Sequence, residues 1–164
     1  MPLIGLYVKA DLENVESITI PADYQWLMDV KQSNGEETRE NVTMNAQESY
    51  EMENSRGSAN FLIKFPGSKS QASISIVTSS QKGVASEYPA QGTNPGDWQP
   101  VAVFECRGAE PCKWHPSKGF RIRTPKGTVF EDADLSEDWY EVCEKSSEPC
   151  QVENLEFEFR VFRG

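Results

Sequence analysis

The sequence has little histidine and cysteine, two residue types on which many catalytic and metal sites depend. It contains one histidine, His115, and four cysteines in 164 residues. His115 stands in KWHPSKG, which has no nucleophile elbow or comparable context for an activated Ser or Cys. Neither G-x-x-x-x-G-K nor G-x-G-x-x-G, the patterns that cradle phosphates, occurs. We therefore predict no catalytic residue, no cofactor and no enzymatic activity.

Long apolar runs and clustered positive charge are also missing. No apolar run approaches the ~20 residues of a membrane-spanning helix. The first residues, MPLIGLYVKADLENV, have no basic segment before their apolar part. We therefore expect a mature protein without a signal peptide, located in the cytoplasm or nucleus, with no membrane partner. The net charge of −10 argues against nucleic-acid binding.

The acidic residues are concentrated near the C-terminus. Residues 131–158 hold eleven Asp or Glu and one Lys, which equals the whole net charge of −10. One interpretation is a docking surface for a basic protein partner, since complementary charge steers association. The alternative is a solvated face that keeps the protein soluble. We expect a monomer in either case.

The four cysteines are Cys106, Cys112, Cys143 and Cys150. Because nothing indicates export, we expect four reduced thiols. Cys106 is expected to pack in the core. Six residues separate Cys143 from Cys150 across an expected hairpin, so a disulfide or a partial metal site between them is the alternative.

Apolar and polar residues alternate with a period of two in several segments, which is typical of strands. Gly, Pro, Asn and Ser clusters bound these segments. No window has a convincing helical stripe, and residues 134–145 hold at most a short helix or a turn. The expected strands are residues 4–12, 24–30, 59–65, 74–76 and 155–161. We predict an all-β fold.

Residues 81–100, QKGVASEYPAQGTNPGDWQP, are rich in Gly and Pro and divide the chain into similar halves. LYVKADLEN, YQWLMDV and NFLIKF/ASISIV follow one another in the first half. VAVFECRGAEP, GFRIR and WYEVCEK/LEFEFRVF follow the same plan in the second. We predict a single domain, 1–164, with half 1 at 1–80, a linker at 81–100 and half 2 at 101–164. The expected architecture is an elongated β-sandwich or barrel-like fold whose halves are related by a pseudo-two-fold axis.

Three motifs resemble one protein family. Leu6, Lys9, Ala10, Leu12, Glu13 and Asn14 match L-x-x-K-A-x-L-E-N, and Ser55 to Asn60 read S-R-G-S-A-N. Phe104 to Pro111 match F-E-C-R-G-x-E-P. With this spacing the chain resembles the eukaryotic CXXC-motif-containing zinc-binding proteins along its whole length. The resemblance implies an elongated, intracellular all-β protein with one structural zinc and no established enzymatic activity.

The resemblance also implies where zinc ligands would stand. The first C-x-x-C falls on Gln32 and Gly35 in KQSNGEE, and the second falls on Phe65 and Ser68 in IKFPGSKSQ. Zinc needs four thiolate or imidazole ligands, so we predict that the site is lost and that no metal is bound. The predicted function is a non-enzymatic binding or adaptor protein. The alternative is a metal- or redox-responsive protein that uses the remaining cysteines.

Overall fold

The computed structural model describes residues 3–53, 57–78, 84–90, 92–94 and 96–163. These residues form strands and turns without a helix, so none of them could cross a membrane as a helix. The strands are β1 (Leu3–Glu13), β2 (Ser17–Thr19), β3 (Trp26–Gln32), β4 (Thr38–Met44), β5 (Tyr50–Glu51), β6 (Ser58–Ala59), β7 (Phe61–Ile63), β8 (Ala72–Ile76), β9 (Glu87–Tyr88), β10 (Gln99–Arg107), β11 (Ala109–Trp114), β12 (Phe120–Arg123), β13 (Val129–Ala133), β14 (Trp139–Val142) and β15 (Pro149–Val161). The all-β prediction is confirmed.

Burial alternates along the strands as the sequence pattern predicts. In β1, Leu6, Val8 and Ala10 are buried, while Tyr7 and Lys9 between them are half-buried. Residues 134–145, for which a short helix or a turn was expected, contain β14 and the turns beside it.

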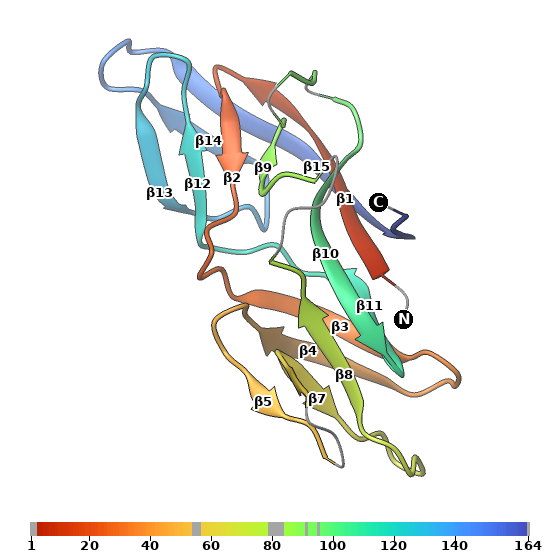
Figure 1. Ribbon diagram of the computed structural model, residues 1–164. Coiled ribbons are helices and arrows are strands. Elements are labelled where there is room, and N and C mark those ends of the chain that lie inside the picture. Colours follow the sequence, from red (N-terminus) through yellow and green to blue (C-terminus); the bar gives the residue numbers. More distant parts are fainter. Residues whose placement is uncertain (1–2, 54–56, 79–83, 91, 95, 164) are drawn as a thin grey trace.

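A six-stranded antiparallel sheet runs through the molecule in the order β14-β15-β1-β10-β8-β7. The long strands β1 and β10 lie at its centre. Two smaller sheets, β11-β3-β4 and β13-β12-β2-β9, lie below and above that centre in Figure 1. A short ladder, β5-β6, completes the fold.

The strand order is symmetric between the two halves of the sequence. If β1 is exchanged with β10, β15 with β8 and β14 with β7, the large sheet has the same strand order when it is read from the opposite edge. The same exchange converts β11-β3-β4 into β2-β12-β13. The predicted pseudo-two-fold fold is therefore present, and its equivalent strands are those that the repeated sequence plan pairs.

The halves are interlocked rather than side by side. β1 pairs with β10 and β15, β2 pairs with β12, and β3 pairs with β11. An isolated C-terminal half would therefore lose the strands that complete both of its sheets. The predicted linker also takes part, because β9 pairs with β2 and Tyr88 is only 2% exposed.

An aromatic cluster joins the three larger sheets. Trp26 contacts Phe104 and Trp114, with ring centroids 5.4 and 5.9 Å apart. Phe120 contacts Trp114 at 6.0 Å and Tyr24 at 4.9 Å. The Trp114 indole N–H donates to the Tyr24 hydroxyl at 3.3 Å, which satisfies both buried polar groups.

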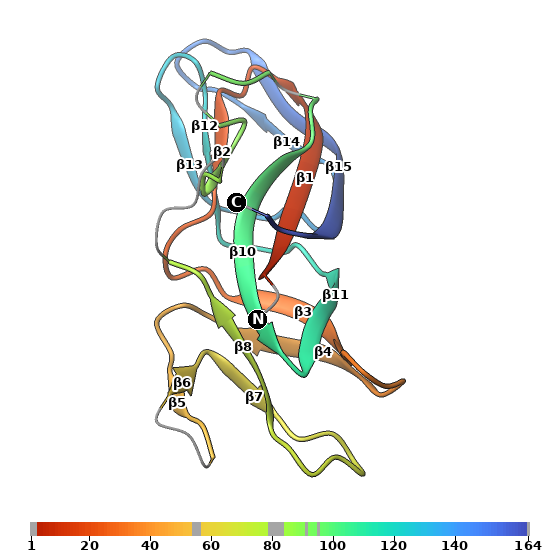
Figure 2. The same ribbon diagram turned by 45° about the vertical axis from the view of Figure 1, so that its right-hand side comes forward.

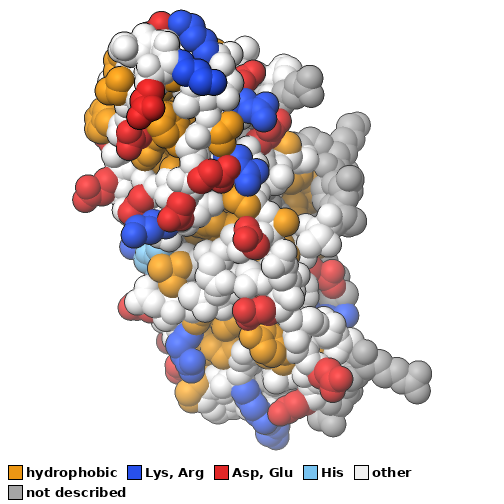
Figure 3. Space-filling view, turned by 90° about the vertical axis from the view of Figure 1, so that its left-hand side faces the viewer, with side chains coloured by type: hydrophobic (Ala, Val, Ile, Leu, Met, Phe, Trp, Pro, Cys, Tyr) orange, Lys and Arg blue, Asp and Glu red, His pale blue; other side chains and the backbone are white. Residues whose placement is uncertain are grey.

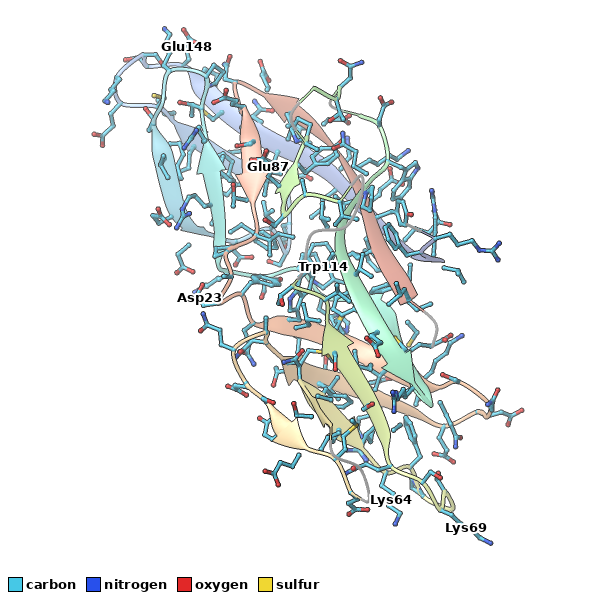
Figure 4. All side chains as sticks on the ribbon, viewed as in Figure 1. Asp23, Lys64, Lys69, Glu87, Trp114 and Glu148 are labelled. Carbon is cyan, nitrogen blue, oxygen red and sulfur yellow. The ribbon has the colours of Figure 1, made fainter. Side chains whose placement is uncertain are left out.

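Each end of the molecule carries two of the hairpin turns. In Figures 1 and 2 the β7–β8 turn lies at the bottom and the β3–β4 turn projects to the right above it, and we call this region the lower end. The β12–β13 and β14–β15 turns lie together at the top and form the upper end. Figure 4 places Lys64 and Lys69 at the lower end and Glu148 at the upper end, with Trp114 between them. By the strand equivalence, the two ends correspond to each other.

Candidate functional site

The β3–β4 turn holds the first two positions that the resemblance assigns to zinc ligands. Gln32 ends β3, and its N–H donates to the carbonyl of Glu37 at 2.8 Å. The next N–H, from Ser33, donates to the carbonyl of Gly108 at 3.0 Å. A Cβ placed on Gly35 would overlap the side-chain amide of Gln32. The Gln32 side chain therefore fills the space that a side chain at position 35 would need.

The β7–β8 turn holds the other two positions. Phe65 is 3% exposed and belongs to the core. The N–H of Ser68 donates to the Phe65 carbonyl at 3.0 Å, and the Ser68 hydroxyl donates to the Ser70 carbonyl at 3.0 Å. Gly67 has φ of 80°, which suits glycine. Backbone and hydroxyl hydrogen bonds thus close this turn without a ligand.

These four residues do not fit a zinc ion. A structural zinc site takes thiolates and imidazoles in a tetrahedron. The lower end offers an amide, a hydroxyl, a buried phenyl ring and a glycine instead. Across the part of the chain that the structure describes, no group of three or more His, Cys, Asp or Glu is arranged to hold a metal.

The other candidate ligands are not brought together into one site. Cys106 is fully buried in β10, and burial together with the Glu110 charge raises its pKa to about 12. It packs in the core, as predicted. Cys112 is exposed on β11, and its thiol donates to the Asp29 carbonyl at 3.4 Å. Burial and the Asp29 charge raise the pKa of Cys112, so this thiol is not activated.

His115 has a structural partner. Its Nε2 lies 2.8 Å from Oδ1 of Asp29, which also accepts the N–H of Asn41 at 2.9 Å. Asn41 has φ of 55°, and the register between β3 and β4 shifts between Met28 and Val30. Burial would raise the pKa of Asp29, but these hydrogen bonds and the His115 charge lower it below 3.8. The pair therefore fixes a β-bulge.

Cys143 and Cys150 do lie together, at the upper end. Cys150 pairs with Glu141 across the β14–β15 ladder, and the N–H of Cys143 donates to the Glu148 carbonyl at 3.0 Å. Cys143 is two residues after Glu141, and residues two apart share a face of a strand. Cys143 and Cys150 therefore lie on the same face, and they are 2% and 1% exposed. Neither is in a disulfide.

Part of the acidic stretch, residues 131–158, forms ion pairs with basic residues of the same chain. Four of its carboxylates have cation partners in the chain: Glu131 with Arg121, Glu148 with Lys126, Glu156 with Lys9 and Glu158 with Arg160. Figure 3, in which β13 faces the viewer near the top, shows acidic side chains interspersed with basic and apolar ones. The stretch is therefore not one uniform acidic patch.

Other carboxylates of the stretch border β14, the terminal strand of the large sheet. Tyr140 and Val142 of this strand are 57% and 58% exposed. Partial desolvation and the charges of Glu153 and Asp138 raise the pKa of Tyr140. We name this surface the acidic edge; it comprises Glu137, Asp138, Tyr140, Glu141, Val142 and Glu153.

The motif residues mostly stabilise turns. Asn14 has φ of 53° and its side-chain N–H donates to the Pro149 carbonyl at 2.7 Å. Its counterpart after β10, Gly108, has φ of 76°, and a Cβ placed on it would lie 3.3 Å from the Cβ of Ala72. Asn60 donates to the Glu48 carbonyl and accepts the Ile76 N–H, both at 2.7 Å. Residues 55 and 56 of the second motif lie outside the described residues.

These features define a class of protein: an all-β molecule with a pseudo-two-fold strand order that gives each end two equivalent hairpin turns. The family model for the eukaryotic CXXC motif containing zinc binding protein matches residues 5–160, and the chain belongs to this family. The family is named for zinc binding, and the names given to its members state no enzymatic activity. This chain has no Cys-x-x-Cys sequence at any position.

Relatives and solved structures match over nearly full length. UPF0587 protein CG4646 of Drosophila melanogaster is 34% identical, with 90% of each chain covered. The CXXC motif containing zinc binding protein of Bos taurus is 31% identical and covers 97% of this chain and 98% of its own. The structure of a hypothetical protein from Plasmodium falciparum has a TM-score of 0.87 at 31% identity and covers 98% of this chain and 100% of its own. The crystal structure of C1orf123 has a TM-score of 0.84 at 27% identity and covers 98% of this chain and 99% of its own.

Sequence reasoning missed Thr128 and Ser146, which surround the Cys143 thiol. The Thr128 hydroxyl lies 3.1 Å from its sulfur. The β12–β13 turn, TPKGT, carries Thr128 to this position from another hairpin. The repeated strand plan could have indicated these residues. It makes the β12–β13 and β14–β15 turns the counterparts of the β3–β4 and β7–β8 turns, which hold the four zinc-ligand positions that the resemblance implies.

Proposed function

We propose that this chain is a non-enzymatic binding protein that folds without zinc. In this proposal it remains a cytoplasmic monomer and uses the acidic edge to bind a basic segment of a protein partner. The observation that carries the proposal is the acidic edge itself. Exposed apolar side chains stand there among carboxylates on a strand that has no neighbour on one side in the described part of the sheet.

The charges of the acidic edge favour a basic partner. Glu137, Glu141 and Glu153 have no cation within 4.0 Å among the described residues, whereas four other carboxylates of the same stretch are paired. An unpaired carboxylate can attract a partner cation without first breaking an internal ion pair. Tyr140 and Val142 add apolar contact area on the same strand.

The backbone of β14 suits recognition by strand addition. The strand has four residues and pairs only with β15 among the described strands. Natural edge strands are kept short and charged to prevent indiscriminate pairing. An extended segment in which Lys or Arg alternates with an apolar residue would match both the free edge and the charge.

One apolar surface cavity offers no group for acid–base catalysis. It has a volume of about 340 Å³ and is lined by residues such as Trp26, Ile76, Val101 and Val103. No titratable side chain is among the described residues that line it. A general acid or base acting in this cavity would have to be one of the lining residues.

The test uses the full chain, because the halves interlock. We would titrate it with a synthetic peptide of eight residues, alternating Lys and Val, and follow backbone amide chemical shifts. The shifts should concentrate on β14. Glu141→Lys with Glu153→Lys should weaken binding about tenfold, since two partly screened charge contacts contribute about 0.5–1 kcal/mol each.

Glu131→Gln is the matched control, because this carboxylate of the same stretch is paired with Arg121 at 2.9 Å. It should leave the affinity within about twofold. Shifts scattered over the molecule, or equal losses for the control and the charge reversals, would show that the stretch is only a solubilising face.

A further inference from the structure

The β14–β15 turn at the upper end is equivalent to the β7–β8 turn at the lower end. Two cysteines, Cys143 and Cys150, flank the turn at the upper end. In the β7–β8 turn the N–H of Ser68 donates to the Phe65 carbonyl at 3.0 Å. In the equivalent β14–β15 turn the N–H of Ser147 donates to the Cys143 carbonyl at 2.7 Å. The buried residue that begins each turn is thus phenylalanine at one end and cysteine at the other.

The surroundings of Cys143 favour its thiolate. Hydrogen bonds from the side chain of Ser146, from Thr128 and from the backbone N–H groups of Ser146 and Lys145 lower the pKa of Cys143 to about 7. The Thr128 Oγ1–Sγ distance is 3.1 Å. Thr128 belongs to the β12–β13 hairpin, and Lys145 and Ser146 belong to the β14–β15 hairpin. The packing of the two hairpins therefore holds these donors around the Cys143 sulfur.

Cys150 is placed to react with Cys143. Its thiol donates to the Glu148 carbonyl at 3.8 Å, and the backbone N–H of Cys143 is directed at its sulfur. Burial and the nearby Cys143 sulfur raise the pKa of Cys150, so this thiol stays protonated. One sulfur is therefore a nucleophile and the other is a neutral thiol beside it.

A small reagent has access to this pair. Both cysteines line a surface cavity of about 70 Å³, together with Asn14, Thr124 and Lys126. A water molecule takes about 30 Å³ of liquid volume, so a molecule the size of hydrogen peroxide fits. Cys143 and Cys150 are 2% and 1% exposed, so reagents reach their sulfurs through this cavity.

We propose that Cys143 and Cys150 form a peroxide-sensitive redox pair that cycles between dithiol and disulfide. The Cys143 thiolate attacks the terminal oxygen of a hydroperoxide, the O–O bond breaks, and Cys143 becomes a sulfenic acid; the leaving oxygen takes a proton from solvent water and departs as an alcohol or water. The Cys150 sulfur then attacks the Cys143 sulfur, its proton leaves with the hydroxyl as water, and the disulfide forms. Two thiols lose two electrons and the peroxide gains them. A small dithiol restores both thiols by exchange.

The test is peroxide treatment of the folded chain, followed by alkylation and peptide mapping. Hydrogen peroxide should remove two of the four thiols, link Cys143 to Cys150, and dithiothreitol should restore both. With Cys150→Ser, Cys143 should be trapped as a sulfenic acid adduct of dimedone. Cys112→Ser, which removes an exposed thiol, should leave the rate of linkage within about twofold.

A second measurement needs no disulfide. Alkylation of Cys143 by a small haloacetamide should have its midpoint near pH 7, and Thr128→Val, which removes the hydroxyl but keeps the shape, should move this midpoint upward. The proposal is overturned if peroxide oxidises Cys112 while Cys143 and Cys150 stay alkylatable. It is also overturned if Cys143 titrates near pH 9 in the folded wild-type protein.

Discussion

Replacing Phe65 with alanine tests whether apolar burial stabilises the lower end, where the family resemblance places the zinc ligands. The ring is 3% exposed and packs in the core. Buried Phe→Ala changes cost about 3–5 kcal/mol, and a site near a hairpin turn relaxes more than the centre of a core. We therefore expect a loss of about 3 kcal/mol in the free energy of unfolding. For a chain of this length that lowers the melting temperature by about 6–12 °C.

Urea unfolding measured by tryptophan fluorescence gives this free energy directly. Tyr140→Ala is the control, because this aromatic residue is 57% exposed on the strand equivalent to β7. It should cost less than about 0.5 kcal/mol. A loss below about 1 kcal/mol for Phe65→Ala would refute the reasoning, since the ring would then not stabilise the lower end.

Three further substitutions test the structure. Asp29→Asn should cost about 1 kcal/mol near neutral pH and flatten the acid limb of a stability–pH profile: the lowered pKa of Asp29 means that its contribution is present above pH 4 and is lost as the pH falls below that. Gly108→Ala should cost about 1–2 kcal/mol in urea unfolding, because φ is 76° and the new Cβ would lie 3.3 Å from that of Ala72; an unchanged midpoint would contradict this. Asn60→Ala should cost about 2 kcal/mol, because it removes two hydrogen bonds of 2.7 Å. The same value for Asn34→Ala, at an exposed turn, would show that those bonds are not the cause.

The sequence predicts the long strands well because apolar residues on the buried face alternate with polar residues on the other face. Leu6, Val8 and Ala10 alternate with polar residues, and β1 covers the predicted segment. The repeated plan of the halves also predicts which strands are equivalent. β4, in contrast, is almost wholly exposed, so it lacks the apolar alternation that would reveal it.

The exchange of strands between halves was not predicted, because pairing between distant strands leaves no local pattern. The many Gly and Pro in residues 81–100 are typical of a linker. The burial of Tyr88 and the pairing of β9 with β2 depend on distant parts of the chain and have no local sequence pattern. The hairpin that brings Cys143 near Cys150 is local and was predictable. The contact with Thr128 depends on packing between two hairpins and was not.

The central claim, that this member of the family folds without zinc, is tested most directly by metal content and chelation of the purified chain. Gln32, Gly35, Phe65 and Ser68 provide no thiolate or imidazole, so elemental analysis should find well below one zinc per chain. The melting temperature should be the same with and without a strong chelator. About one zinc per chain together with unfolding on chelation would contradict the account, because structural zinc contributes on the order of 10 kcal/mol to small domains.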